Sequence, residues 1–381
     1  MKDTMDLQWE KLDDSWNDIQ AVTIYGFGRV AQRNLKKISE DFEIKLIIDN
    51  DARVRDNADA TLKIYSLEKA LPLLRKYKIL VTTSSLAYES IRQDLVKNGL
   101  TEYRDFCRLE TFMLEWYWKN KGQVCISQVL SAITTRCTFR CKHCSNLMPY
   151  FKQQYDYSEK DIYNDLLLLF KKVDYLASYY IMGGEPLLNP KLPEILAIIC
   201  DDFYHKIGYV QVITNGSIVP SDKLVEVLKK YDIKVRISNY TRAIPYSSKY
   251  NDVLKKCREN GIDYSISDYQ TWMNLGFPIE EVNILGDKKE HMLCCSQGCH
   301  SVNDGKFYYC STLWDAEKSG LYELRENDSI DLTKSSDNVK NDKFDFLKYC
   351  LGISEGYIGL CEKCRGFGKD NDFIVDVAEQ I

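Results

Sequence analysis

The chain has 381 residues, of which 45% are apolar, and carries a formal net charge of −5. This length suits two or three domains, and the acidic balance gives no reason to expect nucleic acid or an anionic membrane surface as a partner. We find no apolar segment typical of a signal peptide or a membrane span, which predicts a cytoplasmic protein. Its 14 cysteines are then expected to be reduced and to serve metal ligation, catalysis or burial rather than disulfides.

Residues 1–19 have the pattern of a polar tail or helix, and residues 20–122 alternate strands with helices. This alternation predicts a Rossmann-like parallel sheet covered on both faces. Gly26, Gly28 and Ala31 have the G-x-G-x-x-[GA] spacing after the first strand, and Asp49 ends the second strand at the ribose-binding position of a dinucleotide fingerprint. The region holds one mononucleotide half rather than two, so its ligand remains open.

Residues 123–285 continue the alternation and predict a partial (β/α)6 barrel of the TIM type. Strands are expected at 128–135, 179–182, 209–215, 234–239 and 262–267, and helices at 158–173, 192–203, 221–231 and 249–260. Functional groups in such folds gather where the strands end. Residues 286–381 are different: they have weak periodicity and seven of the cysteines, which predicts a small domain held together by a metal centre.

The segment "CTFRCKHC" places Cys137, Cys141 and Cys144 within eight residues, directly after the first strand of the central region. One interpretation is a helix with three buried cysteines on one face, although Lys, Arg and His lie between them. A second is a zinc site that pairs this segment with the distant Cys361 and Cys364. The third is an iron–sulfur cluster with three protein thiolates, which leaves one iron open to a small molecule.

The third interpretation is supported by a resemblance to a known family. The pattern CxxxCxxC after the first strand of a βα array resembles that of the radical S-adenosylmethionine (SAM) superfamily. The resemblance implies a [4Fe-4S] cluster on Cys137, Cys141 and Cys144 whose open iron binds S-adenosyl-L-methionine. It also implies reductive cleavage to a 5′-deoxyadenosyl radical that abstracts a substrate hydrogen. The family usually has an aromatic residue before the third cysteine, and His143 stands there.

Further motifs at successive strand ends resemble the cofactor-binding segments of the same family. "GGEP" resembles the motif that holds the methionine amino group, for which glycine allows close approach and a carboxylate can pair with an ammonium group. "ITNG" and "ISNY" end the next two strands, where the family places ribose or carboxylate contacts. The predicted cofactor-binding residues are His143, Gly183, Gly184, Glu185, Pro186, Thr214, Asn215, Ser238 and Asn239.

The cysteines after residue 286 resemble the auxiliary-cluster domains of SPASM or twitch type that are appended to many radical SAM enzymes. Cys295, Gly305 and Cys310 follow the order of their opening pattern, and "CEKC" supplies Cys361 and Cys364. The resemblance implies one auxiliary [4Fe-4S] cluster on Cys310, Cys361 and Cys364. Its fourth ligand is Cys299 or Cys295. A structural zinc ion on the same thiols is the alternative.

The substrate is expected to be a small molecule, because residues 20–122 are similar to small Rossmann-like domains attached to enzymes of nucleotide-sugar and polysaccharide metabolism. We therefore predict an oxidoreductase or epimerase acting on a carbohydrate or nucleotide-linked sugar, with a reductase, flavodoxin or ferredoxin as electron donor. In an epimerase, Cys294 is the predicted hydrogen-atom donor. The alternatives are a peptide-modifying maturase and, from another class, a non-catalytic iron–sulfur protein.

Overall fold

The structure, a computed structural model, describes residues 10–56, 63–83, 85–295, 299–334, 338–368 and 370–381. The chain divides into two compact units, residues 1–127 and residues 128–381. The junction lies close to the one expected at residues 122–123. Residues 286–381, expected as a separate domain, belong to the second unit. In the part of the chain that is described, no helix is long and apolar enough to cross a membrane.

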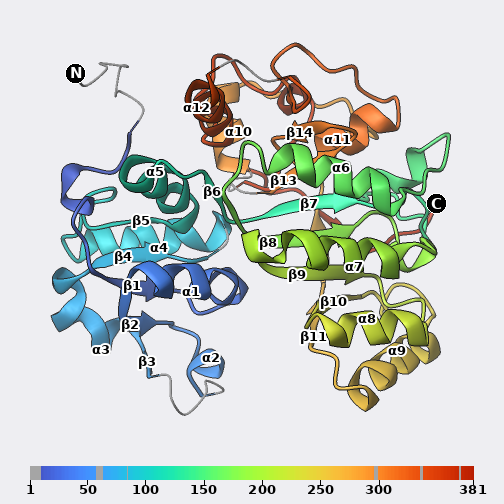
Figure 1. The fold of residues 1–381 in the computed structure, drawn as a ribbon, viewed down its shortest axis with the longest axis horizontal. Helices are drawn as coiled ribbons and strands as arrows, with labels where there is room; N and C mark the ends of the chain where they lie inside the picture. The colour runs from blue at the N-terminus through green and yellow to red at the C-terminus, as the bar shows by residue number, and fades with distance from the viewer. Residues whose placement is uncertain (1–9, 57–62, 84, 296–298, 335–337, 369) are drawn as a thin grey trace. The chain divides into compact units, whose positions relative to one another are not determined.

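The first unit is built on five parallel strands in the order β3-β2-β1-β4-β5 (Figure 1). The inner strands β1 and β4 are rich in apolar residues, and Val22, Ile24 and Ile79 on them are fully buried. The five strands are β1 (Ala21–Tyr25), β2 (Glu43–Ile48), β3 (Ile64–Tyr65), β4 (Lys78–Val81) and β5 (Phe106–Arg108); the short strand β6 (Cys125–Ile126) is not part of this sheet. The helices are α1 (Arg29–Asp41), α2 (Ala52–Asp56), α3 (Leu67–Ala70), α4 (Ser85–Lys97) and α5 (Leu109–Lys121).

The dinucleotide-type turn after β1 is held by the acidic residue at the end of β2. Gly26 has φ +96°, and a Cβ there would lie 2.4 Å from Thr83 Cγ2, so only glycine fits. The Asp49 carboxylate accepts hydrogen bonds from the backbone N–H groups of Phe27 and Asp51, both at 2.8 Å. The carboxylate that the fingerprint assigns to a ribose is therefore bound to the turn itself.

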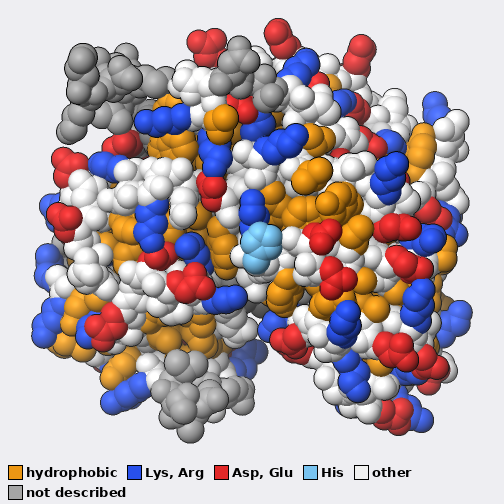
Figure 2. Space-filling model, viewed as in Figure 1, with side chains coloured by type: hydrophobic (Ala, Val, Ile, Leu, Met, Phe, Trp, Pro, Cys, Tyr) orange, Lys and Arg blue, Asp and Glu red, His pale blue; other side chains and the backbone are white. Residues whose placement is uncertain are grey.

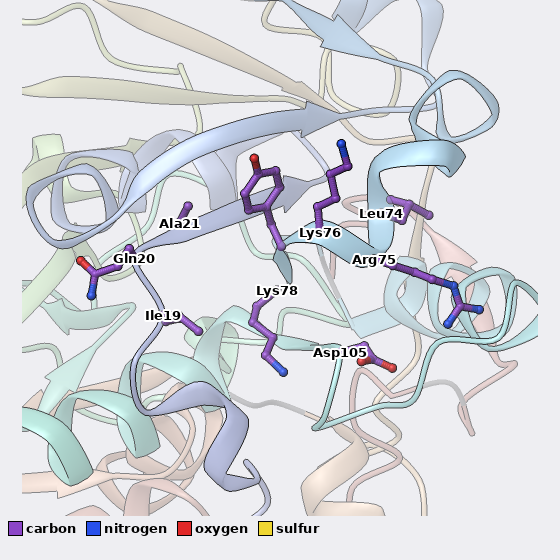
Figure 3. Close-up of a pocket in the computed structure, with 9 residues that line it drawn as sticks. Ile19, Gln20, Ala21, Leu74, Arg75, Lys76, Lys78 and Asp105 are labelled. Atoms are coloured by element: carbon purple, nitrogen blue, oxygen red, sulfur yellow. The ribbon is translucent and has the colours of Figure 1, made fainter.

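A cavity of about 320 Å³ in the first unit lies at the amino ends of these strands (Figure 3). It is lined by residues that precede or begin β1, β4 and β5, among them Ala21, Lys78 and Asp105. The fingerprint turn follows the carboxyl end of β1, so the cavity and the turn are at opposite ends of the strands. This cavity gives no support to a dinucleotide at the fingerprint.

The second unit contains a sheet in the order β11-β10-β9-β8-β7-β13-β14-β15 (Figure 1). Strands β7 to β11 are parallel and come from successive βα units, with α6 and α7 in front of the sheet in this view. The α/β class predicted from the sequence is confirmed. These elements are β7 (Val129–Ala132), β8 (Tyr175–Met182), β9 (Ile207–Thr214), β10 (Lys234–Asn239), β11 (Tyr264–Asp268), α6 (Glu159–Leu169), α7 (Leu192–Phe203), α8 (Asp222–Lys230) and α9 (Ser247–Glu259).

The cysteine-rich segment extends the same sheet instead of packing as an independent body. β13 pairs in parallel with β7, and the Asn303 side chain makes two hydrogen bonds to the backbone of Ala132, at 3.0 and 2.9 Å. A separate two-stranded sheet joins β12 to β16. The remaining elements are β12 (Thr271–Met273), β13 (His300–Asn303), β14 (Lys306–Tyr308), β15 (Ser329–Asp331), β16 (Ile374–Asp376), α10 (Lys288–Cys295), α11 (Ser311–Lys318) and α12 (Val339–Cys350).

Charged side chains of both signs are mixed on the surface. Figure 2 shows Lys and Arg interspersed with Asp and Glu on this face, without one large patch of a single sign. A mixed surface with a small net charge provides little long-range attraction for a polyanion.

Asp165 on α6 binds the turn between β13 and β14. Its carboxylate accepts hydrogen bonds from the backbone N–H groups of Gly305 at 2.7 Å and Asp304 at 3.1 Å. Burial raises the pKa of Asp165 to about 7, and these hydrogen bonds offset only part of that effect. Between pH 4 and 7 the folded state therefore binds a proton that the unfolded state releases. The free energy of unfolding consequently falls by about 1.4 kcal/mol per pH unit as the pH rises through this window.

We expect Asp165→Asn to remove this contribution, because the amide does not titrate. Urea unfolding at several pH values between 4 and 7 measures the slope of the unfolding free energy. The slope of the variant should be more positive than that of the native chain by about 1.4 kcal/mol per pH unit. The exposed Asp202 is the control, and Asp202→Asn should leave the slope unchanged. Equal slopes for Asp165→Asn and the native chain would contradict the prediction.

Candidate active site

Three thiols of the loop that follows β7 line one cavity of about 280 Å³ in the second unit. Burial raises the pKa of Cys137 and of Cys144 to about 12, and that of Cys141 to about 11. The free thiols are therefore protonated at neutral pH. A coordinated metal removes this barrier, because it deprotonates its thiol ligands. The three cysteines thus form a donor set that becomes anionic when a metal binds.

Gly183 and Gly184 form the turn that carries β8 past the start of the cysteine loop. Gly183 has φ +148°, and a Cβ on it would lie 2.2 Å from the Thr134 carbonyl oxygen. A Cβ on Gly184 would lie 2.2 Å from the carbonyl oxygen of Arg136. The backbone N–H of Gly184 also donates to the Thr134 carbonyl at 3.0 Å. Both glycines line the cavity, so the close approach of the two backbones forms part of its wall beside Cys137.

Glu185 is not among the residues that line the cavity, and its carboxylate connects two strand ends. Its side chain is fully buried and accepts hydrogen bonds from Thr214 Oγ1 at 2.7 Å, Asn215 N at 2.7 Å and Leu187 N at 3.1 Å. Burial raises its pKa to about 7 despite these donors. The sequence suggested that Glu185 pairs with an ammonium group of a ligand. In the structure its carboxylate instead joins the turn after β8 to the turn after β9.

The other predicted cofactor-binding residues divide into two groups. His143, Thr214, Asn215 and Ser238 line the cavity together with the two glycines. Asn215 also donates from Nδ2 to Thr138 Oγ1 at 2.9 Å and lies 3.7 Å from Cys137 Sγ. Pro186 and Asn239 are not among the lining residues, and the Asn239 amide donates to Asp268 at 3.0 Å. The ends of β8 and β10 therefore combine residues that line the cavity with residues that do not.

The last five residues of the sequence, 377–381, bind the cysteine loop, which sequence analysis missed. Gln380 donates from Nε2 to Cys141 Sγ at 3.2 Å and accepts from the Arg140 N–H at 2.9 Å. Lys142 N donates to the Glu379 carbonyl at 2.7 Å, and Ile381 N donates to the Arg140 carbonyl at 2.9 Å. Val377 and Ala378 pack in a small apolar cluster with Cys141. We call residues 377–381 the C-terminal strap.

A second group of thiols gathers in the cysteine-rich segment: Cys295, Cys299, Cys310, Cys361 and Cys364. Burial and the thiols of Cys364, Cys310 and Cys299 raise the pKa of Cys295 well above its ordinary value. The pKa of Cys361 is raised in the same way by burial and by Cys310, Cys295 and Cys364. Backbone N–H groups of Phe367 and Gly366 donate to Cys295 Sγ at 3.1 Å and to Cys364 Sγ at 3.4 Å. These hydrogen bonds suit sulfur atoms that carry negative charge.

Cys294, the predicted hydrogen-atom donor, is not among the residues that line the cavity at Cys137. Its sulfur lies near Gly368, where a Cβ would be 2.8 Å from Cys294 Sγ and 2.6 Å from Asp370 Oδ1. The Asp370 carboxylate is also bound to His291 on the preceding turn of α10. Cys294 and Cys295 therefore face different surroundings, and Cys295 is the one that joins the thiol group.

The donor set of Cys137, Cys141 and Cys144 suits an iron–sulfur cluster better than a single metal ion. One tetrahedral zinc ion requires thiolates about 3.8 Å apart, given Zn–S bonds of about 2.3 Å. Within the described ranges, no three His, Cys, Asp or Glu side chains are arranged to hold a single ion. A four-iron cluster separates its thiolate ligands more widely, and three ligands leave one iron open. The two glycines allow the turn after β8 to lie directly against the backbone of the cysteine loop.

The fold and this site define an α/β domain with a three-cysteine centre at the carboxyl ends of its parallel strands. Residues 131–284 match the family model of the Radical SAM superfamily. The chain therefore contains a radical SAM domain, as predicted from the sequence. Such a domain implies a [4Fe-4S] cluster and S-adenosyl-L-methionine.

Similar proteins were found among curated sequences and solved structures. An uncharacterized protein of Methanocaldococcus jannaschii is 29% identical over 119 residues, which are 30% of this chain and 38% of that protein. The chain thus spans well under half of this curated relative. The structure of BtrN in complex with AdoMet and 2-DOIA is 14% identical, with a TM-score of 0.41, covering 66% of this chain and 98% of that one. Native anSMEcpe with bound AdoMet is 13% identical, with a TM-score of 0.41, covering 62% and 84%.

Proposed function

We propose that this chain is a radical SAM oxidoreductase that dehydrogenates a small polar substrate. The observation that carries the proposal is the single cavity lined by Cys137, Cys141, Cys144 and the paired glycines. When bound, the cluster supplies the electron that cleaves S-adenosylmethionine and so provides the 5′-deoxyadenosyl radical. The chain's own residues hold the three sulfurs in one cavity, and the glycine turn after β8 forms part of its wall.

An auxiliary cluster on the second thiol group would complete the oxidation. We propose Cys295, Cys310, Cys361 and Cys364 as its ligands. These four thiols are buried enough for burial to raise the pKa of each, whereas Cys299 is exposed. Cys299 Sγ instead accepts a hydrogen bond from Gln128 at 3.5 Å. This set resembles SPASM and twitch domains and leaves Cys299 outside it.

The proposed reaction removes one hydrogen atom, one proton and one electron from the substrate. The hydrogen atom goes to the 5′-deoxyadenosyl radical, which becomes 5′-deoxyadenosine, and S-adenosylmethionine also yields methionine. The proton would go to water and the electron to a cluster held by Cys295, Cys310, Cys361 and Cys364, while a flavodoxin- or ferredoxin-type donor would supply the electron for the next cleavage. We favour dehydrogenation over epimerisation because Cys294, the candidate hydrogen donor, does not line the cavity.

The test uses anaerobically reconstituted protein with dithionite, S-adenosylmethionine and a panel of nucleoside diphosphate sugars, run in D₂O. We expect 5′-deoxyadenosine release that rises with one panel member, and a product two mass units lighter than its substrate, because two hydrogens leave and none returns. Mass spectrometry measures both. A product of unchanged connectivity that carries one solvent deuterium at the abstracted carbon would indicate epimerisation and contradict the proposal. A response to peptides alone would indicate a peptide-modifying enzyme instead.

A further inference from the structure

Successive side chains of strand β10 lie alternately in the buried core and at the cavity. Val235 and Ile237 are buried on one face, whereas Arg236 and Ser238 line the cavity from the other. This is the period of two expected for a strand whose two faces have different surroundings. Ser238 belongs to the cofactor-binding segments predicted from the sequence, but Arg236 does not. The structure therefore adds a cationic side chain to this site.

Arg236 is a cation without an acidic partner. Its Nε atom is buried and has no hydrogen-bond partner among the residues that the structure describes. No Asp or Glu of those residues forms an ion pair with it, and no Asp or Glu is among the residues that line the cavity. The guanidinium carbon lies 5.4 Å from the centre of the Tyr180 ring. A buried guanidinium nitrogen without an acceptor is costly, so this arrangement favours an anionic ligand.

Arg236 does not lie at the end of the cavity that the three cysteines line. In the parallel register Arg236 pairs with Ile213, one residue before the end of β9, and Ser238 is two residues further along β10. Two residues of a strand span about 6.6 Å. The guanidinium leans toward Tyr180, which precedes the end of β8 by two residues. Arg236 thus lies deeper along the strands than the loop that carries the three thiols.

We propose that Arg236 binds an oxyanion of the substrate, either a phosphate or a carboxylate. The planar guanidinium can hold both kinds of group through two parallel hydrogen bonds. This inference rests on the proposed function for the location of S-adenosylmethionine, which is bound at the strand ends beside the cysteines. It narrows the substrate class to anionic molecules, such as a phosphorylated or nucleotide-linked sugar or a carboxylate-bearing metabolite.

Isothermal titration calorimetry on the anaerobically reconstituted protein tests this inference with inorganic pyrophosphate and malonate as probes. Each probe is titrated in the presence of saturating S-adenosylmethionine, and S-adenosylmethionine itself is titrated separately. We expect Arg236→Met to weaken binding of at least one probe by roughly ten- to a hundredfold, the usual effect of losing a charge-assisted pair. Arg236→Lys keeps the charge but not the fork, and should weaken it less. The affinity for S-adenosylmethionine should stay unchanged.

Lys234 provides the matched control, because it lies on the same strand but outside the cavity lining and is paired with Asp263 at 3.0 Å. Lys234→Met should leave the affinity for both probes as it is. An equal loss for Lys234→Met, or no binding of either probe to the native chain, would overturn the inference. So would a loss of S-adenosylmethionine affinity alone in Arg236→Met, because Arg236 would then hold the methionine carboxylate. Failure of the proposed function is a separate result, since it appears as absent 5′-deoxyadenosine release.

Discussion

Replacing Cys137, Cys141 and Cys144 together with alanine should abolish release of 5′-deoxyadenosine. The three sulfurs line one cavity and are the donors from which we assign the open-iron cluster. Without them, S-adenosylmethionine has no site at which an electron can reach its sulfonium group. Chromatography of reactions that contain dithionite and S-adenosylmethionine measures the product directly. The iron content should fall by half, from about eight to about four atoms per chain, because the auxiliary cluster remains.

Cys200 offers a control for the loss of a buried thiol, because it lies on α7 and does not line the cavity. Cys200→Ala should keep both the iron content and the release of 5′-deoxyadenosine. A triple variant that releases as much product as the native chain would refute the assignment of the site. The native chain could instead contain about four irons and one bound zinc ion. That result would support the first cluster but would assign a zinc ion, not a cluster, to Cys295, Cys310, Cys361 and Cys364.

Removing the C-terminal strap should make the first cluster labile. Truncation after Asp376 deletes the Gln380 hydrogen bond to Cys141 Sγ and the backbone bonds to Arg140 and Lys142. It also exposes the apolar cluster that Val377 and Ala378 form with Cys141. The loop that carries the ligands is then free to move, and solvent and oxygen reach the sulfur. We expect the truncated protein to lose about half of its iron during gel filtration, because only the first cluster is lost and the auxiliary cluster remains.

A single substitution tests the hydrogen bond from the Gln380 side chain to Cys141 separately from the rest of the C-terminal strap. Gln380→Ala keeps the backbone of the strap but removes the donor to Cys141, so the cluster should be retained with a lower reduction potential, because the thiolate charge is less stabilised. Potentiometric titration followed by electron paramagnetic resonance measures this shift. Lys142→Ala, which loses only the exposed contact with the Glu379 side chain, should leave the potential unchanged. Full iron retention by the truncated protein would show that the strap has no role in holding the cluster.

The sequence by itself determined the features that depend on local pattern. Apolar strands alternating with amphipathic helices predict a parallel α/β fold, because each pattern buries one kind of surface. CxxxCxxC brings Cys137, Cys141 and Cys144 together through a short loop, and the glycines of "GGEP" mark a turn at the next strand end. These residues are near one another in the chain or follow successive parallel strands, so the topology alone places them at one edge of the sheet.

Only the tertiary structure decided where individual side chains point and which distant segments meet. Gln380 contacts Cys141 across 239 residues, and no local periodicity encodes such a contact. Glu185 follows the cavity-lining Gly184 directly, yet its carboxylate turns inward to Thr214, since a carboxylate at a buried strand end is stabilised by the nearest donors. Arg236 is one of four polar residues in the six-residue strand β10, and its lack of an acidic partner emerges only when the neighbouring strands are in place. Local sequence sets backbone pattern, whereas long-range packing sets burial and partners, and these determine the chemistry of the site.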